Sequence, residues 1–319
     1  MKSLVLISPD KRNVPENVSQ KLKPLADVIY LNKDLEDHIE GAEALLVGGE
    51  TIDDDFLDKA PKLGIAARFG VGYDSVDVEA CTKRGVYVAH TPDVLSAGVA
   101  DHTWALILGF MRHIPEADKY VRKEWANRER RLEFGWELKD KTLGILGLGS
   151  IGREVLKRAQ GFDMRLVYND VVRKRDLEKE FGVQFVDKEE LLRASDILSI
   201  HVPLLESTRH SIGSHELSIM KPSALIVNTS RGQVIDEDAL YEALKDGKIK
   251  GAALDVFYEE PTPLHNPLLE LENVVLSPHC ASATWETRRK MAELAVDNIR
   301  AYLEGERPPT LVPEQREKL

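Results

Sequence analysis

Three polar side chains stand where α/β enzymes commonly place their catalytic groups. Arg231, Glu260 and His279 each follow a short apolar stretch that is typical of a buried strand. The arginine fork is suited to binding a carboxylate, and histidine exchanges protons near neutral pH. A carboxylate beside that histidine would stabilise the imidazolium. These residue types together indicate hydride transfer at the carbonyl of a small acid, which requires an anion anchor and a proton donor.

The spacing leaves the identity of the assisting carboxylate open. Glu259 and Glu260 are adjacent, so distance along the chain from His279 cannot separate them. A second histidine, His201, also ends an apolar stretch, but Val202 and a proline follow it directly. We interpret His201 as a core or rim histidine and His279 as the candidate for proton transfer.

A glycine-rich turn indicates how the hydride would be supplied. Gly147, Gly149 and Gly152 fit the pattern G-x-G-x-x-G, between an expected strand at 142–146 and an expected helix at 153–160. The first glycine permits the tight turn, the second lets a pyrophosphate approach the backbone, and the third packs the helix on the strand. The free N–H groups at the start of such a helix favour an anion. The pattern predicts a dinucleotide site.

Asp170 ends the second expected strand of this unit, at 165–170. A carboxylate there accepts hydrogen bonds from the ribose hydroxyls and repels a 2′-phosphate, so it favours NAD(H) over NADP(H). Arg173, Lys174 and Arg175 follow closely and could soften that repulsion. We interpret them as an exposed first helical turn, and NAD(H) remains the expected cofactor.

The elements that must position these residues alternate between strand and helix along most of the chain. The first ninety residues and the central segment each predict a doubly wound parallel sheet. A long helical stretch at 97–122, broken near Pro115, separates them, and a last helix is expected at 282–304. We predict a Rossmann domain at 100–287, inserted into a flavodoxin-like domain made of 1–99 and 288–319.

Composition limits the classes of partner. The chain has 319 residues and a formal net charge of −11, so we expect neither a nucleic acid nor an anionic membrane as partner. Two cysteines, Cys81 and Cys280, give no disulfide framework and suit the cytoplasm. We expect no membrane-spanning segment and no bound metal.

The chain resembles the D-isomer-specific 2-hydroxyacid dehydrogenase family almost from end to end. The segments that carry the resemblance are 68–74, 90–92, 99–101, the glycine turn, 228–232, 251–261 and 277–279. The resemblance implies that Arg231, Glu260 and His279 form the catalytic trio, with the acid directly before Pro261 as the partner of the histidine. It also implies that backbone at Val71 and Gly72 helps to hold the substrate carboxylate.

The resemblance extends to the cofactor. It implies contacts from the glycine turn and from the residues that end the neighbouring strands. The expected cofactor-binding residues are Gly147, Gly149, Ser150, Ile151, Gly152, Asp170, Val202, Thr229, Ser230 and Asp255. Cys280 and Ala281 depart from the Ile-Gly pair that is frequent after the histidine of this family.

The resemblance is strongest to glyoxylate and hydroxypyruvate reductase-like members, so a small 2-oxo or 2-hydroxy acid is the expected substrate. Within the family, 3-phosphoglycerate and phosphite remain alternative substrates, although Val71 stands where phosphite dehydrogenase places a lysine. A different class of alternative is a corepressor-like module that binds NAD(H) without turnover.

Aromatic residues cluster between the two expected domains. Trp104, Trp125, Phe134 and Trp136 lie close together in the sequence. Such clusters occur both in interior cores and in subunit interfaces. The family resemblance implies a homodimer through this region.

Overall fold

The structure, a computed structural model, describes residues 2–31, 35–126 and 131–318. Its contacts divide the chain into unit 1, residues 1–95 and 283–319, and unit 2, residues 96–282. In sequence, unit 2 is therefore inserted into unit 1. The predicted boundaries at 99/100 and 287/288 would each cut a helix, α5 (Ser96–Met111) and α12 (Trp285–Leu303). The contacts group α5 whole with unit 2 and α12 whole with unit 1, because each helix packs along its length on one sheet.

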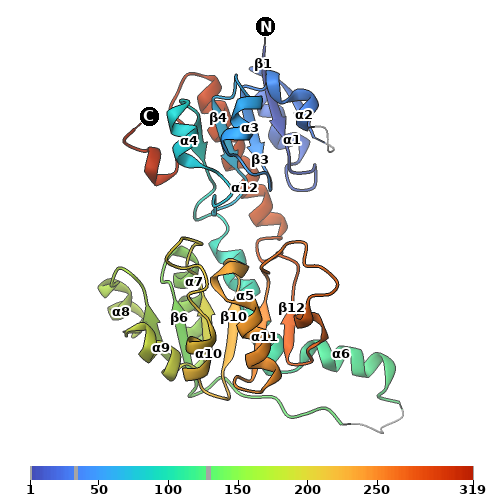
Figure 1. Ribbon diagram of the computed structural model, residues 1–319, viewed down its shortest axis with the longest axis vertical. Coiled ribbons are helices and arrows are strands. Elements are labelled where there is room, and N and C mark those ends of the chain that lie inside the picture. The colour runs from blue at the N-terminus through green and yellow to red at the C-terminus, as the bar shows by residue number, and fades with distance from the viewer. Residues whose placement is uncertain (1, 32–34, 127–130, 319) are drawn as a thin grey trace. The chain divides into compact units, whose positions relative to one another are not determined.

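Within the described part of unit 1, five parallel strands are ordered β2-β1-β3-β4-β5. Figure 1 shows this unit with its helices, among them the long helix near the end of the chain. The strands are β1 (Ser3–Ile7), β2 (Ala26–Tyr30), β3 (Ala44–Val47), β4 (Ile65–Arg68) and β5 (Tyr87–Ala89). The helices are α1 (Glu16–Ser19), α2 (Leu35–His38), α3 (Asp54–Lys59), α4 (Val78–Lys83) and α12. This strand order is that of flavodoxin-like sheets. The long helix α12 packs on β3 and β4, so the last helix of the chain belongs to unit 1.

Within the described part of unit 2, seven parallel strands are ordered β12-β11-β10-β9-β6-β7-β8. They are β6 (Thr142–Leu146), β7 (Arg165–Asn169), β8 (Gln184–Phe185), β9 (Ile197–Ile200), β10 (Leu225–Asn228), β11 (Gly251–Leu254) and β12 (Val274–Leu276). The order reverses at β6, as in Rossmann sheets. Both units are thus doubly wound parallel sheets, as predicted.

Helices cover both faces of the unit 2 sheet because its strands are apolar on both sides. Leu143 and Ile145 of β6 pack into one buried cluster, while Leu146 packs into the other. Helices α5 and α7 (Ser150–Ala159) lie on the first face, and α9 (Lys188–Ala194), α10 (Ser214–Ile219) and α11 (Glu237–Lys245) on the second. Two more helices are α6 (Ile114–Lys123) and α8 (Arg175–Phe181).

The predicted break near Pro115 is confirmed. Helix α5 ends at Met111, and His113 has a φ of 52° before α6 begins at Ile114. Pro115 lies in the first turn of α6, where its missing N–H has no helical partner to lose.

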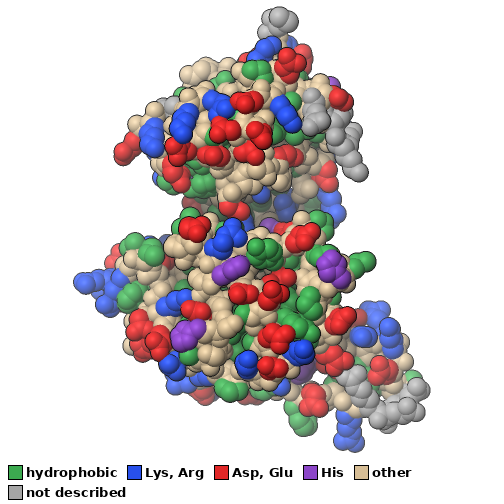
Figure 2. Space-filling model, in the orientation of Figure 1, with side chains coloured by type: hydrophobic (Ala, Val, Ile, Leu, Met, Phe, Trp, Pro, Cys, Tyr) green, Lys and Arg blue, Asp and Glu red, His purple; other side chains and the backbone are tan. Residues whose placement is uncertain are grey.

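The surface is mixed in charge. Figure 2 shows acidic and basic side chains interspersed over the visible face of each unit. Among the residues that the structure describes, no helix is long and apolar enough to cross a membrane.

Candidate active site

The glycine turn of unit 2 has the geometry of a dinucleotide cradle. Gly147 has a φ of +92°, which side-chain-bearing residues rarely adopt, and a Cβ there would lie 2.9 Å from the carbonyl of His201. A Cβ on Gly152 would lie 2.3 Å from the oxygen of Gly147. A Cβ on Gly149 would meet nothing within 4 Å. Two glycines are therefore required by packing, and the third leaves open space above the backbone.

Helix α7 begins directly after this turn. Its N-cap is Gly149, and no side chain caps its first turn. The N-terminus of α7 therefore lies at Ser150 and Ile151, where the helix dipole favours negative charge. The residues present fit a bound pyrophosphate.

Asp170 is held at the mouth of the glycine turn. Its Oδ2 accepts the backbone N–H of Leu148 at 2.7 Å, and its Oδ1 accepts that of Val172 at 3.0 Å. Of the three basic residues that follow it, Arg173 pairs with another carboxylate. Arg173 donates from Nε and Nη2 to Glu178 at 2.8 Å each. That hydrogen bond is the largest cause that lowers the pKa of Glu178 to about 2.

The catalytic candidates lie on loops at the carboxyl ends of β10, β11 and β12. His279 Nδ1 lies 2.5 Å from Oε2 of Glu260, and Phe257 donates its backbone N–H to Oε1 at 3.0 Å. The structure thus selects Glu260 over Glu259 as the partner of the imidazole. The side chains of His279 and Glu260 are 47% and 34% exposed, so the pair is open to small molecules.

The electrostatics of this pair favour an ionised carboxylate. Burial raises the pKa of Glu260, but the hydrogen bond and charge of His279, the Phe257 N–H and the charge of Arg231 outweigh it. The pKa of Glu260 is therefore below its ordinary value. An ionised Glu260 stabilises the protonated form of His279, which is the form that can donate a proton.

Arg231 is fixed by the loop that follows β10. Its Nη1 donates to the carbonyl of Ser230 at 2.8 Å, and Asn228 donates to the carbonyl of Arg231 at 2.8 Å. Ser230 donates its backbone N–H and its hydroxyl to Oδ1 of Asn228. The amide of Asn228, 1% exposed, therefore ties the loop that carries both Arg231 and Ser230.

The remaining cofactor candidates lie at the same edge of the sheet. Val202 follows β9, and its side chain would be 2.9 Å from a Cβ on Gly147, so it lies against the glycine turn. Thr229 is buried, and its hydroxyl is 3.1 Å from that of Thr103 on α5. Because parallel strands end together, residues distant in sequence gather here.

Asp255 differs from the expectation. Its side chain is 0% exposed, so in this structure it offers no surface to a cofactor. Its Oδ1 accepts the Ser277 hydroxyl at 2.6 Å and the Cys280 N–H at 2.9 Å, and its Oδ2 accepts the Ala281 N–H at 2.8 Å. The Asp255 carbonyl also accepts the backbone N–H of His279 at 2.7 Å. Asp255 therefore supports the His279 loop from beneath.

Sequence reasoning missed His102 of α5. Its Nε2 lies 2.9 Å from the Ser277 hydroxyl and 3.3 Å from Oδ1 of Asp255. No strand ends at His102, so the criterion that found the other candidates could not find it. His201, by contrast, is half-buried, in keeping with a position in the core or at its rim. It bonds to the Ser199 hydroxyl at 2.8 Å, and burial lowers its pKa to about 3.

Val71 and Gly72 belong to unit 1, on the loop after β4. The Val71 carbonyl accepts a hydrogen bond from Nδ1 of His90 at 2.9 Å, and Gly70 accepts the N–H of Thr91 at 2.8 Å. The Arg68 guanidinium donates to the carbonyl of Phe69 at 3.1 Å. These bonds fix the loop at the carboxyl edge of the unit 1 sheet.

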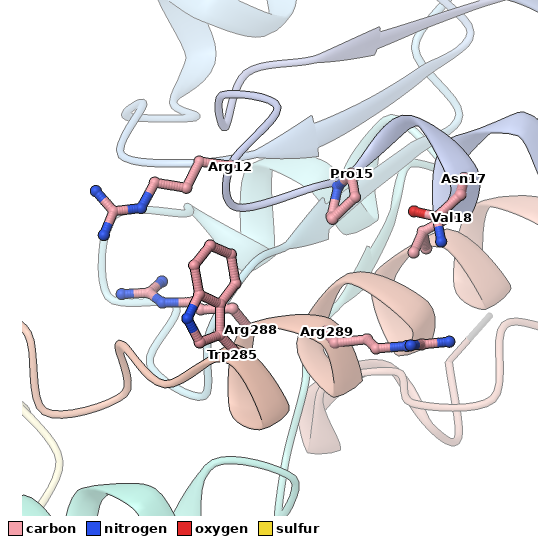
Figure 3. A pocket seen from close by; sticks show the side chains of 7 residues that line it. All are labelled: Arg12, Pro15, Asn17, Val18, Trp285, Arg288 and Arg289. Atoms are coloured by element: carbon pink, nitrogen blue, oxygen red, sulfur yellow. The ribbon is translucent and has the colours of Figure 1, made fainter.

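Unit 1 also contains a cavity of about 220 Å³ beside α1 and the start of α12. Its lining residues are Arg12, Pro15, Asn17, Val18, Trp285, Arg288 and Arg289. Figure 3 shows the Arg289 side chain directed toward Asn17 and the other two arginines directed the opposite way. The three guanidinium groups do not converge on one point, so the cavity is not built around a single small anion.

Known proteins share this sequence and fold. Residues 104–281 match the family model of the D-isomer-specific 2-hydroxyacid dehydrogenase NAD-binding domain. The chain is 50% identical over 268 residues to a glyoxylate reductase of Korarchaeum cryptofilum, covering 83% of this chain and 81% of that protein. It is 46% identical to the glyoxylate reductase of Thermococcus litoralis, covering 98% and 97%.

Solved structures agree. One is an NADPH-dependent glyoxylate/hydroxypyruvate reductase from Sinorhizobium meliloti in complex with NADP and malonate, at 32% identity, 98% coverage of each chain and a TM-score of 0.89. The family domain that matches lies within unit 2, which holds the glycine turn and the Glu260–His279 pair. We conclude that the chain is an oxidoreductase with a nicotinamide-cofactor domain and belongs to the D-isomer-specific 2-hydroxyacid dehydrogenase family.

Proposed function

We propose that this protein reduces a small 2-oxo acid, such as glyoxylate or hydroxypyruvate, with NADH. The observation that carries the proposal is the 2.5 Å contact of His279 with Glu260, at the sheet edge that also bears Arg231 and the glycine turn. The similarity to glyoxylate reductases over most of both chains supports a small acid as substrate.

Different residues of the chain bind the substrate and transfer the proton in this reaction. When bound, the nicotinamide supplies the hydride at its C4 for the C2 carbonyl carbon of the substrate. Arg231 binds the substrate carboxylate and polarises the carbonyl, with backbone N–H groups at Val71 and Gly72 as further donors. His279 bonds to Glu260 through Nδ1, so its Nε2 donates the proton to the carbonyl oxygen. Oxidation of a 2-hydroxy acid reverses these roles.

The cofactor proposed is NAD(H). Gly147, Gly149, Ser150, Ile151, Gly152, Val202, Thr229 and Ser230 would surround it, and Asp255 would support the loop beneath it. The Asp170 carboxylate lies next to the glycine turn, where the adenosine ribose would bind. Arg173 pairs with Glu178 at 2.8 Å. This arrangement supports NADH over NADPH, unlike the NADPH-dependent relative from Sinorhizobium meliloti.

A homodimer through α6 and the segment after it is also proposed. Ile114, Val121, Trp125 and Phe134 are 58%, 53%, 59% and 94% exposed. Large exposed apolar side chains of this kind mark interaction surfaces. Trp104 does not contribute, because it is buried and stacks on Phe162 within unit 2.

The test is NADH oxidation measured at saturating cofactor with glyoxylate, hydroxypyruvate, pyruvate and a bulkier 2-oxo acid, each repeated with NADPH. We expect the highest kcat/KM with a small acid and NADH. Binding of NADH without turnover of any of these acids would contradict the proposal and favour a binding module.

A further inference from the structure

A second group of reactive side chains lies beneath the His279 loop, and the catalytic roles above do not use it. His102 of α5, Asp255 after β11 and Cys280 after β12 each offer one ligand atom, and these three atoms all lie within 4.8 Å of one another. They are a nitrogen, an oxygen and a sulfur, the donor atoms that zinc binds in proteins.

The distance between two of these ligand atoms already matches that in a metal site. His102 Nε2 and Asp255 Oδ1 are 3.3 Å apart. Two ligands in a tetrahedral zinc site with bonds of about 2.0 Å are separated by about 3.3 Å. The sulfur of Cys280 can complete a triangle, and water or the Ser277 hydroxyl can occupy the fourth position.

The charge balance favours a cation. Asp255 is fully buried, and the groups that bond to its carboxylate are backbone N–H groups, a hydroxyl, a thiol and an imidazole. The Asp255 carboxylate brings a negative charge into a poorly hydrated place, which costs free energy unless a cation balances it. A divalent cation that replaces the thiol proton would make the group neutral.

The site is reachable from solvent, and it depends on the thiol of Cys280. The His102 side chain is 23% exposed and Cys280 is partly exposed, so a hydrated ion can approach from their side. Cys280 stands where the family frequently has isoleucine, which cannot bind a metal. Cys81, the other cysteine, is buried in unit 1 and, among the described residues, belongs to no such three-residue cluster.

We propose that His102, Asp255 and Cys280 form a binding site for a zinc-like divalent cation that inhibits the enzyme. On binding, a metal–sulfur bond forms, the Cys280 S–H bond breaks and its proton passes to solvent. The metal takes the place of the hydrogen bonds that Asp255 makes to the Ser277 hydroxyl and the Cys280 thiol. Because Cys280 adjoins His279, metal binding moves the loop that carries the imidazole. The inhibitory part rests on the proposed function, whereas the binding part does not.

The first experiment titrates the chelator-treated full-length protein with Co²⁺ and records its absorption spectrum. We expect one Co²⁺ per chain, with the charge-transfer band of a cobalt–thiolate bond, and displacement of that band by Zn²⁺. Cys280→Ser should lose the band, and His102→Gln should bind at least tenfold more weakly. Cys81→Ala is the matched control and should keep the parent spectrum. Absence of the band in the parent, or an equal band in Cys280→Ser, overturns the proposal.

A second measurement needs no variant. Iodoacetamide should alkylate Cys280 in the metal-free protein, and Zn²⁺ should slow that reaction at least tenfold, read by peptide mass. Cys81 serves as the internal reference for unfolding. Equal alkylation with and without Zn²⁺ contradicts binding. If Zn²⁺ protects Cys280 but NADH-dependent turnover is unchanged, the metal site stands and its inhibitory role is refuted. The protection result itself does not depend on whether the protein reduces glyoxylate.

Discussion

Glu260 uses both carboxylate oxygens, Oε2 toward Nδ1 of His279 at 2.5 Å and Oε1 toward the Phe257 N–H at 3.0 Å. The second bond fixes the carboxylate before any substrate binds. The imidazole is consequently held by one nitrogen, and the other nitrogen is left for chemistry. General acid catalysis depends on this kind of fixed pair.

Glu260→Gln should reduce the kcat of glyoxylate reduction by roughly 100-fold, a typical contribution of general acid–base catalysis. The amide keeps the size of the side chain but loses the negative charge that stabilises the imidazolium. Glu259→Gln is the control and should keep the parent kcat. A parent-like kcat in Glu260→Gln would remove the carboxylate from the mechanism.

Arg231→Lys should lower kcat/KM for glyoxylate, and Arg231→Ala should lower it by more than about 100-fold. Lysine keeps the charge but cannot present two parallel N–H groups to a carboxylate. The affinity for NADH, measured by fluorescence, should change little in either variant. If both variants turned over glyoxylate normally, another cation would have to bind the substrate.

Asp170→Ala should raise the ratio of kcat/KM for NADPH to that for NADH at least tenfold. The change removes the charge that repels a 2′-phosphate, while the Leu148 N–H loses its acceptor. Asp176→Ala, an exposed acid on α8, is the matched control. An unchanged ratio in Asp170→Ala would show that cofactor choice resides elsewhere.

Gly152→Ala should destabilise the protein by about 1–3 kcal/mol and weaken NADH binding. The new Cβ would lie 2.3 Å from the backbone oxygen of Gly147, which cannot move without opening the turn. Gly161→Ala meets nothing within 4 Å and serves as the control. Thermal unfolding monitored by circular dichroism, with and without NADH, separates the two effects. Equal melting temperatures for both variants would contradict this packing argument.

The Glu178–Arg173 pair should make stability depend on pH in the acid range. The pKa of Glu178 falls from 4.5 to about 2 on folding, mainly through Arg173. A lowered pKa in the folded state adds stability above the unfolded value, and this is lost as pH falls from about 4.5 toward 2. The difference in melting temperature between parent and Glu178→Gln should be constant near neutrality and shrink below pH 4.5. A constant difference down to pH 3 would contradict the pairing.

Much of the fold could be predicted because parallel sheets leave strong local patterns. A strand covered by helices on both faces must be apolar throughout, as Thr142–Leu146 is, and glycine turns follow strands at fixed spacing. The domain boundaries were less accurate. The helices Ser96–Met111 and Trp285–Leu303 connect the two units in sequence, and nothing local says with which sheet each one packs.

The sequence by itself was enough to propose the glycine turn, the acid after β7 and the strand-end residues Arg231 and His279 as site candidates, because each lies beside a local pattern. Only the tertiary structure gives geometric evidence that the carboxylate in contact with the imidazole is that of Glu260 and not that of Glu259. It also turned Asp255 from an expected cofactor contact into a buried support, and it brought His102 from α5 to the same carboxylate. At the same place, the contact of His102 with Ser277 joins residues 175 positions apart. No periodicity or spacing records these contacts, since they arise when strand ends and a covering helix meet in space.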